Sequence, residues 1–259
     1  LFETRLEGVQ FRVWQSSYYG VNFMAHWHNE VELIYVRNGS LLVCLNNIEY
    51  EMKTGDLLIC NSGDIHYGMS GNEKTITSFI LVNPNIIGKL YNMQRCVSPL
   101  ITSAQIEKYH LRDEVERLFT TVRNELKTHP PYYEYMIRSE FGHFWPLMLR
   151  SVPCKPFDAN EYRQKRMKNL LNLQKVFDYI ENNYMFDINL DTAASIMHFS
   201  AGHFSKMFKS LTGVNFVSYV NSIRIEKAIQ MLTSTNKKII DIAFECGFST
   251  VHTFNRAFQ

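Results

Sequence analysis

The chain has 259 residues, a length that favours two domains, and 46% of them are apolar, enough for two hydrophobic cores. The formal net charge is only +2, so a strongly basic character over the whole chain is excluded, although 11 basic residues face 7 acidic ones from Lys165 onward. The five cysteines are scattered without a C-x-x-C pair, which argues against a disulfide framework and a structural zinc site and favours a reducing, cytoplasmic location. The sequence has no apolar run of bilayer length and no visible signal peptide, so we expect no membrane partner.

Residues 1–105 have the pattern of short β-strands separated by turn residues. Arg37-Asn38-Gly39-Ser40 has the composition of a hairpin turn. Regular short strands of this kind predict a sandwich or a small barrel. The expected strands are 11–14, 32–36, 41–45, 48–52, 56–60 and 75–82.

The same region resembles the cupin barrel. Most of the two cupin motifs is reproduced by Gly20, His26, His28, Glu32 and Gly39, and then by Gly55, Gly63 and His66. The second motif departs from the usual pattern at Asn61 and Ser70, where Pro and Asn are common. The resemblance implies that three imidazoles and one carboxylate face a common interior.

Two interpretations of His26, His28, Glu32 and His66 stay open. Three imidazoles and a carboxylate suit a divalent metal such as Fe, Mn, Ni or Zn, and metal-dependent cupins hold their metal at these positions. The alternative is a polar lining whose members bond to one another or to a small effector.

From Ile106 the apolar period changes to that of helices. One helix is expected to end near His129-Pro130-Pro131, and a second to cover 132–150 with a kink or break at Pro146. Residues 151–169, which contain two prolines and a basic run, are the predicted linker, and 170–259 the second domain.

The second domain contains one pattern twice, at an offset of fifty residues. Ala193, Phe204 and Phe208 of the first copy match Ala243, Phe254 and Phe258 of the second. Each copy has the pattern of a helix, a tight turn and a second helix, with Ser200 as an N-cap and Gly213 as a C-cap in the first. A helix over 216–233, roughly 27 Å long, joins the copies. Two helix-turn-helix units so spaced suit successive major grooves of DNA.

The run from Phe199 to Phe258 resembles the DNA-binding domain of the AraC/XylS family of bacterial transcription regulators. Its landmarks include Gly213, Phe216, Arg224, Gly247-Phe248 and Phe254. The basic tail usual in the family is absent, so the second motif is expected to be cut short at its C-terminal end. The expected fold is α+β and multidomain: a cupin-type barrel with following helices (106–150), then an all-α domain with two helix-turn-helix motifs.

The resemblance also implies site residues. DNA-binding positions are Ser200, Ala201, Gly202, Ser205, Lys206, Lys209, Thr250, Val251, His252, Asn255 and Arg256; the effector site comprises His26, His28, Glu32, His66, Trp14 and Tyr35; homodimerisation would use Leu111, Val115, Leu118 and Val122. Packing of this last stripe on the barrel is the alternative, and both roles stay open. Arg256 is expected to pair with guanine and Asn255 with adenine.

The sequence therefore predicts a cytoplasmic transcription regulator, not an enzyme. Its expected partners are promoter DNA, a small effector such as a sugar or related metabolite, a second copy of the chain and, as the family permits, RNA polymerase. A metal-dependent cupin enzyme fused to a DNA-binding module is the competing hypothesis, and a regulator with an empty barrel is a third.

Overall fold

The computed structural model describes residues 11–19, 22–71, 73–92, 94–156 and 173–258. Gly20 and most of the predicted linker (157–169) lie outside this range. The chain divides into two compact units, Glu3–Ala159 and Asn160–Gln259. Within the described residues, no helix combines the length and apolar character needed to cross a bilayer.

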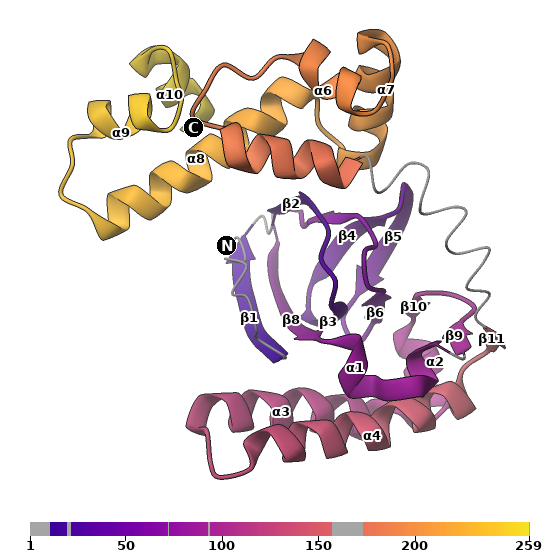
Figure 1. Ribbon diagram of the computed structural model, residues 1–259. Helices are drawn as coiled ribbons and strands as arrows, with labels where there is room; N and C mark the ends of the chain where they lie inside the picture. Colours follow the sequence, from indigo (N-terminus) through magenta and orange to yellow (C-terminus); the bar gives the residue numbers. More distant parts are fainter. Residues whose placement is uncertain (1–10, 20–21, 72, 93, 157–172, 259) are drawn as a thin grey trace. The chain divides into compact units, whose positions relative to one another are not determined.

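Two antiparallel sheets form the centre of the first unit (Figure 1). The larger sheet has the order β1-β8-β3-β6-β10, and the smaller one β2-β7-β4-β5. Alternate residues of β3, such as Ile34 and Val36, meet Leu41 and Val43 of β4 in a core between the two sheets. The strands are β1 (Phe11–Tyr19), β2 (Asn22–His26), β3 (Val31–Asn38), β4 (Ser40–Leu45), β5 (Ile48–Lys53), β6 (Leu57–Cys60), β7 (His66–Met69), β8 (Lys74–Val82) and β10 (Leu100–Ile101). The six predicted strands are thus confirmed, and the pattern of short strands missed β2, β7, β10 and a further strand, β9 (Gln94–Cys96).

The predicted hairpin at 37–40 is wrong, because the two strands it separates belong to different sheets. β3 pairs with β6 and β8, whereas β4 pairs with β5 and β7. Gly39 has φ +84, and a Cβ there would lie 2.8 Å from Thr75 Oγ1. Glycine is therefore required where the chain crosses from one sheet to the other.

Helices cover the outer face of the larger sheet. Leu33, Tyr35 and Ile59 on that face share one core with Phe119 and Phe141 of two long helices, α3 (Arg112–Thr128) and α4 (Tyr133–Ser151), which lie side by side in Figure 1. The unit also contains α1 (Pro84–Ile87), a 3-10 helix η1 (Gly88–Asn92), α2 (Ser103–Lys108) and a two-stranded sheet of β9 (Gln94–Cys96) and β11 (Cys154–Pro156).

Several predicted boundaries need correction. The helices of 106–150 share the core of the strands before them, so the two sheets and these helices form one folded unit rather than two. α4 is one continuous helix through Pro146. The predicted linker begins too early, because Ser151 ends α4 and Cys154 pairs with Cys96 in a sheet.

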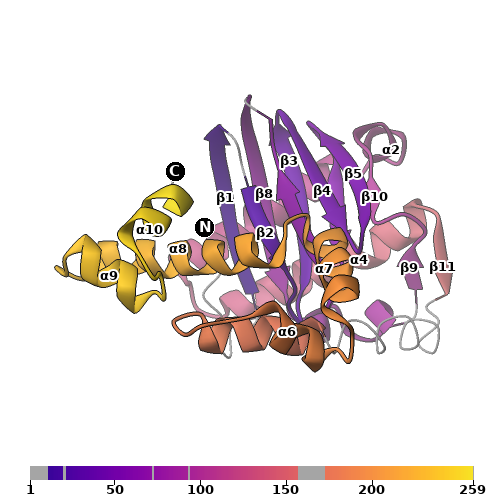
Figure 2. The same ribbon diagram turned by 90° about the horizontal axis from the view of Figure 1, so that it is seen from above.

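The second unit is entirely helical where it is described. It contains a helix over 173–183, then α6 (Leu190–Ile196), α7 (Ala201–Thr212), α8 (Phe216–Ser234), α9 (Ile239–Glu245) and α10 (Val251–Phe258). Figures 1 and 2 show α6–α7 and α9–α10 at opposite ends of α8. A 19-residue helix spans about 28 Å.

Each end of α8 carries its own core. Phe204 and Phe208 of α7 pack with Phe216 and Tyr219 near the start of α8. At the other end Ala228 lies in a cluster with Ala243 and Phe254. The predicted caps Ser200 and Gly213 are confirmed: Ser200 accepts from the His203 N–H, and Gly213 has φ 76.

Candidate functional site

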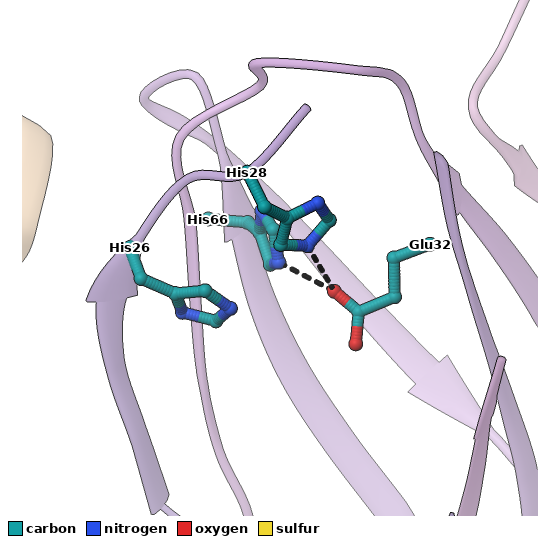
Figure 3. A group of neighbouring side chains, drawn as sticks. All are labelled: His26, His28, Glu32 and His66. Carbon is teal, nitrogen blue, oxygen red and sulfur yellow. Dashed lines mark hydrogen bonds and ion pairs between the residues drawn. The ribbon is translucent and has the colours of Figure 1, made fainter. Parts of the chain in front are cut away.

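Four polar side chains meet between the two sheets at one end of the first unit. His26 ends β2 and lies opposite His66, which begins β7; Glu32 is on β3 of the other sheet, and His28 is in the connection between β2 and β3. Their ligand atoms all lie within 4.8 Å of one another, and Figure 3 shows them converging. The structure therefore brings together the four residues that the cupin resemblance singled out.

Backbone carbonyl groups orient all three imidazole rings. The Nδ1 atoms of His26, His28 and His66 lie 2.8, 3.1 and 3.0 Å from the carbonyl oxygens of Met24, Glu30 and Asp64. A carbonyl oxygen can only accept, so each Nδ1 carries the proton and donates. The Nε2 atoms are left for the interior of the site.

Glu32 lies within hydrogen-bonding distance of two of these rings. Its Oε2 lies 2.6 Å from His66 Nε2 and 3.3 Å from His28 Nε2 (Figure 3). Burial alone raises the pKa of Glu32, but the charge of His66 and the hydrogen bonds from His28 and His66 outweigh it and hold the pKa below its usual value. The carboxylate is thus ionised although it is buried.

The dense surroundings of His26 disfavour its charged form. Burial, followed by the nearby charge of His66, lowers the pKa of His26 to about 3, so its ring is neutral at physiological pH. A neutral ring whose Nδ1 carries the proton has a lone pair on Nε2. His26 therefore offers an electron pair to whatever enters the site.

This geometry requires a positive charge opposite Glu32. With Nδ1 protonated in each ring, the Nε2 atoms of His28 and His66 either hold a second proton and donate to Glu32, or present lone pairs beside the carboxylate. The second arrangement is stable only around a cation. First-row metal ions bind imidazole nitrogen at about 2.0–2.1 Å and their histidine ligands typically donate the other N–H to a carbonyl or carboxylate. The donor set therefore fits a divalent metal as well as a proton-sharing cluster.

Aromatic rings flank the four side chains. Phe23 makes edge contacts with both His26 and His66, at centroid distances of 6.0 and 6.2 Å. Trp14 stacks on Phe79 at 4.9 Å, and Phe79 contacts Phe23. The site thus combines a polar centre with an aromatic side, and Trp14 is connected to it through Phe79 and Phe23.

Phe23 and Phe79 were missed by the reasoning from sequence. The available signal was Gly68, a glycine inside a strand. Phe23 is the register partner of Gly68, and a Cβ at Gly68 would overlap the Phe23 ring. The glycine therefore keeps Phe23 against the histidines.

Tyr35 is not part of this site, contrary to the prediction. Residues 32 and 35 have opposite parity on β3, and successive side chains of a strand point to opposite faces. Tyr35 therefore faces the helices, with its ring 5.5 Å from that of Phe119.

The predicted dimerisation residues are also placed differently. Leu111, Val115, Leu118 and Val122 are at most 2% exposed and belong to the core beneath the larger sheet. Their apolar stripe is already covered within the chain. The packing alternative is therefore correct for these four residues, and the dimerisation assignment is wrong.

The eleven predicted DNA-binding residues all keep solvent-accessible surface. Lys206, Lys209, His252, Asn255 and Arg256 are exposed, as are Ser200, Gly202 and Thr250, while Ala201, Ser205 and Val251 are partly buried. On the opposite sides of α7 and α10, Phe204, Phe208 and Phe254 are buried. Each helix thus presents its polar side outward. Phe258, which matches the buried Phe208 in the sequence repeat, is 46% exposed.

Two protein-family models match the chain. An "AraC-like ligand binding domain" matches residues 9–85, and a "Helix-turn-helix domain" matches residues 193–259. The chain belongs to the AraC/XylS family. The first match contains all four residues of the histidine–glutamate site, and the second contains both α7 and α10.

Relatives include HTH-type transcriptional regulators. One from Staphylococcus aureus (strain MSSA476) is 27% identical over 205 residues, which is 77% of this chain and 27% of the relative. YdeC of Bacillus subtilis (strain 168) is 22% identical over 246 residues, covering 90% of this chain and 81% of that protein. The chain thus spans about a quarter of the length of the S. aureus relatives it matches.

Among solved structures, apo ToxT from Vibrio cholerae is similar in fold. The TM-score is 0.53 at 14% sequence identity, covering 98% of this chain and 94% of ToxT. The likeness extends over both units and concerns the fold alone.

Proposed function

We propose that this chain is a DNA-binding transcription regulator whose activity responds to a small effector bound between the sheets of its first unit. The observation that carries the DNA-binding part is the pair of helices α7 and α10. Each buries phenylalanine on one side and exposes cationic or amide side chains on the other, as recognition helices do.

The two helices stand at opposite ends of one rigid element. α7 packs on the start of α8 and α10 on its end. Successive major grooves on one side of B-DNA are about 34 Å apart. The chain therefore suits a duplex whose two recognition blocks are separated by roughly one helical turn, about 10 base pairs.

Selection of duplexes from a random-sequence library tests this proposal. We expect retained DNA to contain two enriched blocks about one turn apart, with affinity falling steeply as salt rises because cationic side chains displace counterions. Replacing both Lys206 and Arg256 by alanine should abolish enrichment. Lys127, an exposed lysine on α3, provides the control, since Lys127→Ala should bind like the unchanged chain. Failure to retain any duplex at low salt would exclude DNA binding.

The effector is proposed to bind beside His26, His28, Glu32 and His66, against the ring of Trp14. Imidazole and carboxylate groups hydrogen-bond hydroxyl groups, and aromatic rings pack on the apolar faces of sugars. A sugar or a related polyhydroxylated metabolite fits this combination. A ligand that binds only one arrangement of the protein shifts its population, which is the physical basis of regulation.

A thermal-shift screen of metabolites tests the effector part, because a ligand of the folded state raises the melting temperature. We expect a hit whose effect is lost in Trp14→Ala and Glu32→Gln. Promoter affinity and transcription that are unchanged by every stabilising metabolite would remove the sensing role and leave a regulator without an effector.

We also propose a divalent metal as an occupant of the histidine–glutamate site. The supporting observation is that three Nδ1–carbonyl bonds direct three Nε2 atoms toward the same carboxylate. When bound, such an ion would supply a Lewis-acidic centre, which is also what a cupin enzyme would need. His26, His28, Glu32 and His66 would hold it.

Elemental analysis and cobalt titration separate the alternatives. A metal at one equivalent that is lost in His66→Gln, but retained in His143→Gln, supports a metal centre; His143 is an exposed histidine on α4. Turnover of a substrate by the loaded protein would favour the enzyme alternative. Protein that binds no metal, yet is stabilised by a metabolite, would favour a metal-free sensor.

A further inference from the structure

Two of the five cysteines face each other across a short sheet. β9 and β11 are antiparallel, and Cys96 is the register partner of Cys154. The next pair is linked by a hydrogen bond in which Val97 N–H donates to the Pro153 carbonyl at 2.9 Å. Hydrogen-bonded and non-hydrogen-bonded pairs alternate along an antiparallel ladder. Cys96 and Cys154 therefore form a non-hydrogen-bonded pair.

This kind of pair brings two side chains close together on one face. Opposed Cα atoms of a non-hydrogen-bonded pair lie about 4.5 Å apart. Disulfides join cysteines whose Cα atoms are about 4.4–6.8 Å apart. The typical spacing of such a pair therefore falls within the range that a disulfide needs.

The two thiols also interact with each other. Burial, together with the charge and hydrogen bonding of Cys154, raises the pKa of Cys96 to about 12. Burial also raises the pKa of Cys154, but the hydrogen bond from Cys96 opposes this rise. Of the two thiolates, only that of Cys154 is favoured by the hydrogen bond between them, so we assign the first attack to Cys154.

The pair differs from the other cysteines in access. Cys44, Cys60 and Cys246 are buried, whereas Cys96 and Cys154 keep accessible surface. Cys96 also lines a cavity of about 200 Å³ with Arg95, Pro99 and Trp145. A small reagent can therefore approach this pair while the remaining thiols are shielded by the core.

We propose that Cys96 and Cys154 form a reversible disulfide that joins β9 to β11 when the protein meets a small disulfide oxidant such as oxidised glutathione. The Cys154 thiolate attacks the glutathione disulfide, forming a mixed disulfide and releasing one glutathione thiolate. The Cys96 thiolate then attacks the Cys154 sulfur and releases the second. Two electrons pass from the protein to glutathione, and the two thiol protons go to the two glutathione thiolates.

A disulfide at this position would restrain the end of the first unit. It is the last described strand of the first unit, and the chain passes to the second unit between Ala159 and Asn160. A covalent link to β9 fixes the strand from which the chain leaves the first unit. The Val97 amide, which donates to Pro153, should then open less often and exchange its proton more slowly.

Mass spectrometry of the full chain tests the proposal. After incubation with oxidised glutathione, we expect the mass to fall by two hydrogen atoms, a peptide map to show Cys96 joined to Cys154, and dithiothreitol to reverse both. Hydrogen exchange at Val97 should slow several-fold in the oxidised protein.

Serine variants provide matched controls. Neither Cys96→Ser nor Cys154→Ser should lose the two hydrogens. Cys96→Ser should stop at a glutathione adduct on Cys154, and Cys154→Ser, which lacks the attacking thiol, should stay free of glutathione at Cys96. Cys246→Ala should still form the bond. Oxidised wild-type protein in which iodoacetamide alkylates both Cys96 and Cys154 would overturn the proposal. So would a disulfide that involves Cys44, Cys60 or Cys246.

Discussion

The two helix-turn-helix units of the second domain share a plan but differ in their turns. α6 covers residues 190–196 and α9 covers residues 239–245, so the two helices correspond at an offset of 49 residues. α7 and α10 begin at Ala201 and Val251, an offset of 50. The second turn is therefore one residue longer, and the single fifty-residue offset predicted from the sequence is wrong for the first helix of each unit.

The turns also begin on different residues. Equivalent hydrogen bonds run from His198 N–H to the Ser195 carbonyl and from Gly247 N–H to the Phe244 carbonyl. Both residues have positive φ, 58° at His198 and 85° at Gly247. Only the second turn has the residue type that adopts this conformation without steric cost.

The first helix-turn-helix motif, α6 and α7, has more capping interactions than the second, α9 and α10. Asn189 and Ser200 cap the N-termini of α6 and α7 with their side chains, and Gly213 ends α7. α9 begins after Lys238 without a side-chain cap, and its first residue, Ile239, is 57% exposed. The outer faces differ as well: α10 carries Asn255 and Arg256, whereas α7 combines Lys206 and Lys209 with the small residues Ala201, Gly202 and Ser205. The first helix-turn-helix motif thus has more side-chain caps, and base reading is proposed to depend mainly on the second.

Gly247→Ala should produce the largest loss of stability. A Cβ there would lie 2.5 Å from the Tyr184 carbonyl oxygen and 2.9 Å from the Met185 backbone. Overpacking and positive φ together should cost about 2–4 kcal/mol of unfolding free energy. Chemical denaturation measures this cost.

Gly202→Ala is the matched control in the first unit. Nothing lies within 4 Å of a Cβ at Gly202, and the residue is in the first turn of α7. The same substitution should therefore stabilise by up to about 1 kcal/mol, because alanine favours helix. Equal effects of the two substitutions would contradict the contrast between the units.

Arg224→Ala should have the next largest effect. From the middle of α8, Arg224 donates to the Tyr184 and Phe186 carbonyls at 2.7 and 2.9 Å, and its guanidinium lies 5.8 Å from the Phe248 ring. It thus joins the segment after the helix at 173–183 to the second turn. Loss of these bonds should cost about 2–3 kcal/mol.

Lys227, one turn further along α8, provides the control for Arg224. Its amine lies 4.0 Å from Glu181 in a partly exposed ion pair. Such pairs contribute about 0–1 kcal/mol. Lys227→Ala should leave the denaturation midpoint nearly unchanged, and a loss as large as that of Arg224→Ala would show that charge rather than anchoring matters.

Substitutions in the two proposed recognition helices should differ in their effect on sequence preference. Arg256→Ala should weaken DNA binding by about 1–3 kcal/mol and relax the preference at one base pair, while Lys209→Ala should weaken all sequences alike and reduce the salt slope by about 1. Repeating the library selection with each variant measures both. An unchanged sequence preference in Arg256→Ala would mean that α10 does not read bases through this residue.

Patterns that depend on local periodicity were readable from the sequence. The buried faces of α7 and α10 and the caps of α7 follow from spacing and residue type. The four side chains of the histidine–glutamate site were implied by the resemblance to the cupin motifs. What failed depends on pairing at long range. Whether β3 and β4 share a sheet, and whether the stripe of α3 is covered, is decided by partners far away in the chain.

Tyr35 shows the same limit within the site. The alternation of side chains along β3 places Tyr35 and Glu32 on opposite faces of the strand. The sequence does not show which of these faces meets the other sheet and which is covered by helices. The place of Phe23 in the site could not be predicted for a related reason, since it depends on the pairing of Phe23 with Gly68 on another strand.

His198→Gly should have the smallest effect and the most informative sign. His198 is exposed and makes the same turn bond as Gly247, but with a side chain at φ 58°. Glycine stabilises the folded state by about 1–2 kcal/mol, because it relieves the strain of the left-handed conformation. It also stabilises the unfolded state by about 0.5–1 kcal/mol, because its backbone is more flexible there. The net change should be a stabilisation below about 1 kcal/mol, seen as a slightly higher denaturation midpoint. A clear destabilisation would mean that the imidazole makes a stabilising contact, and the first turn would then owe its geometry to its side chain rather than to its backbone.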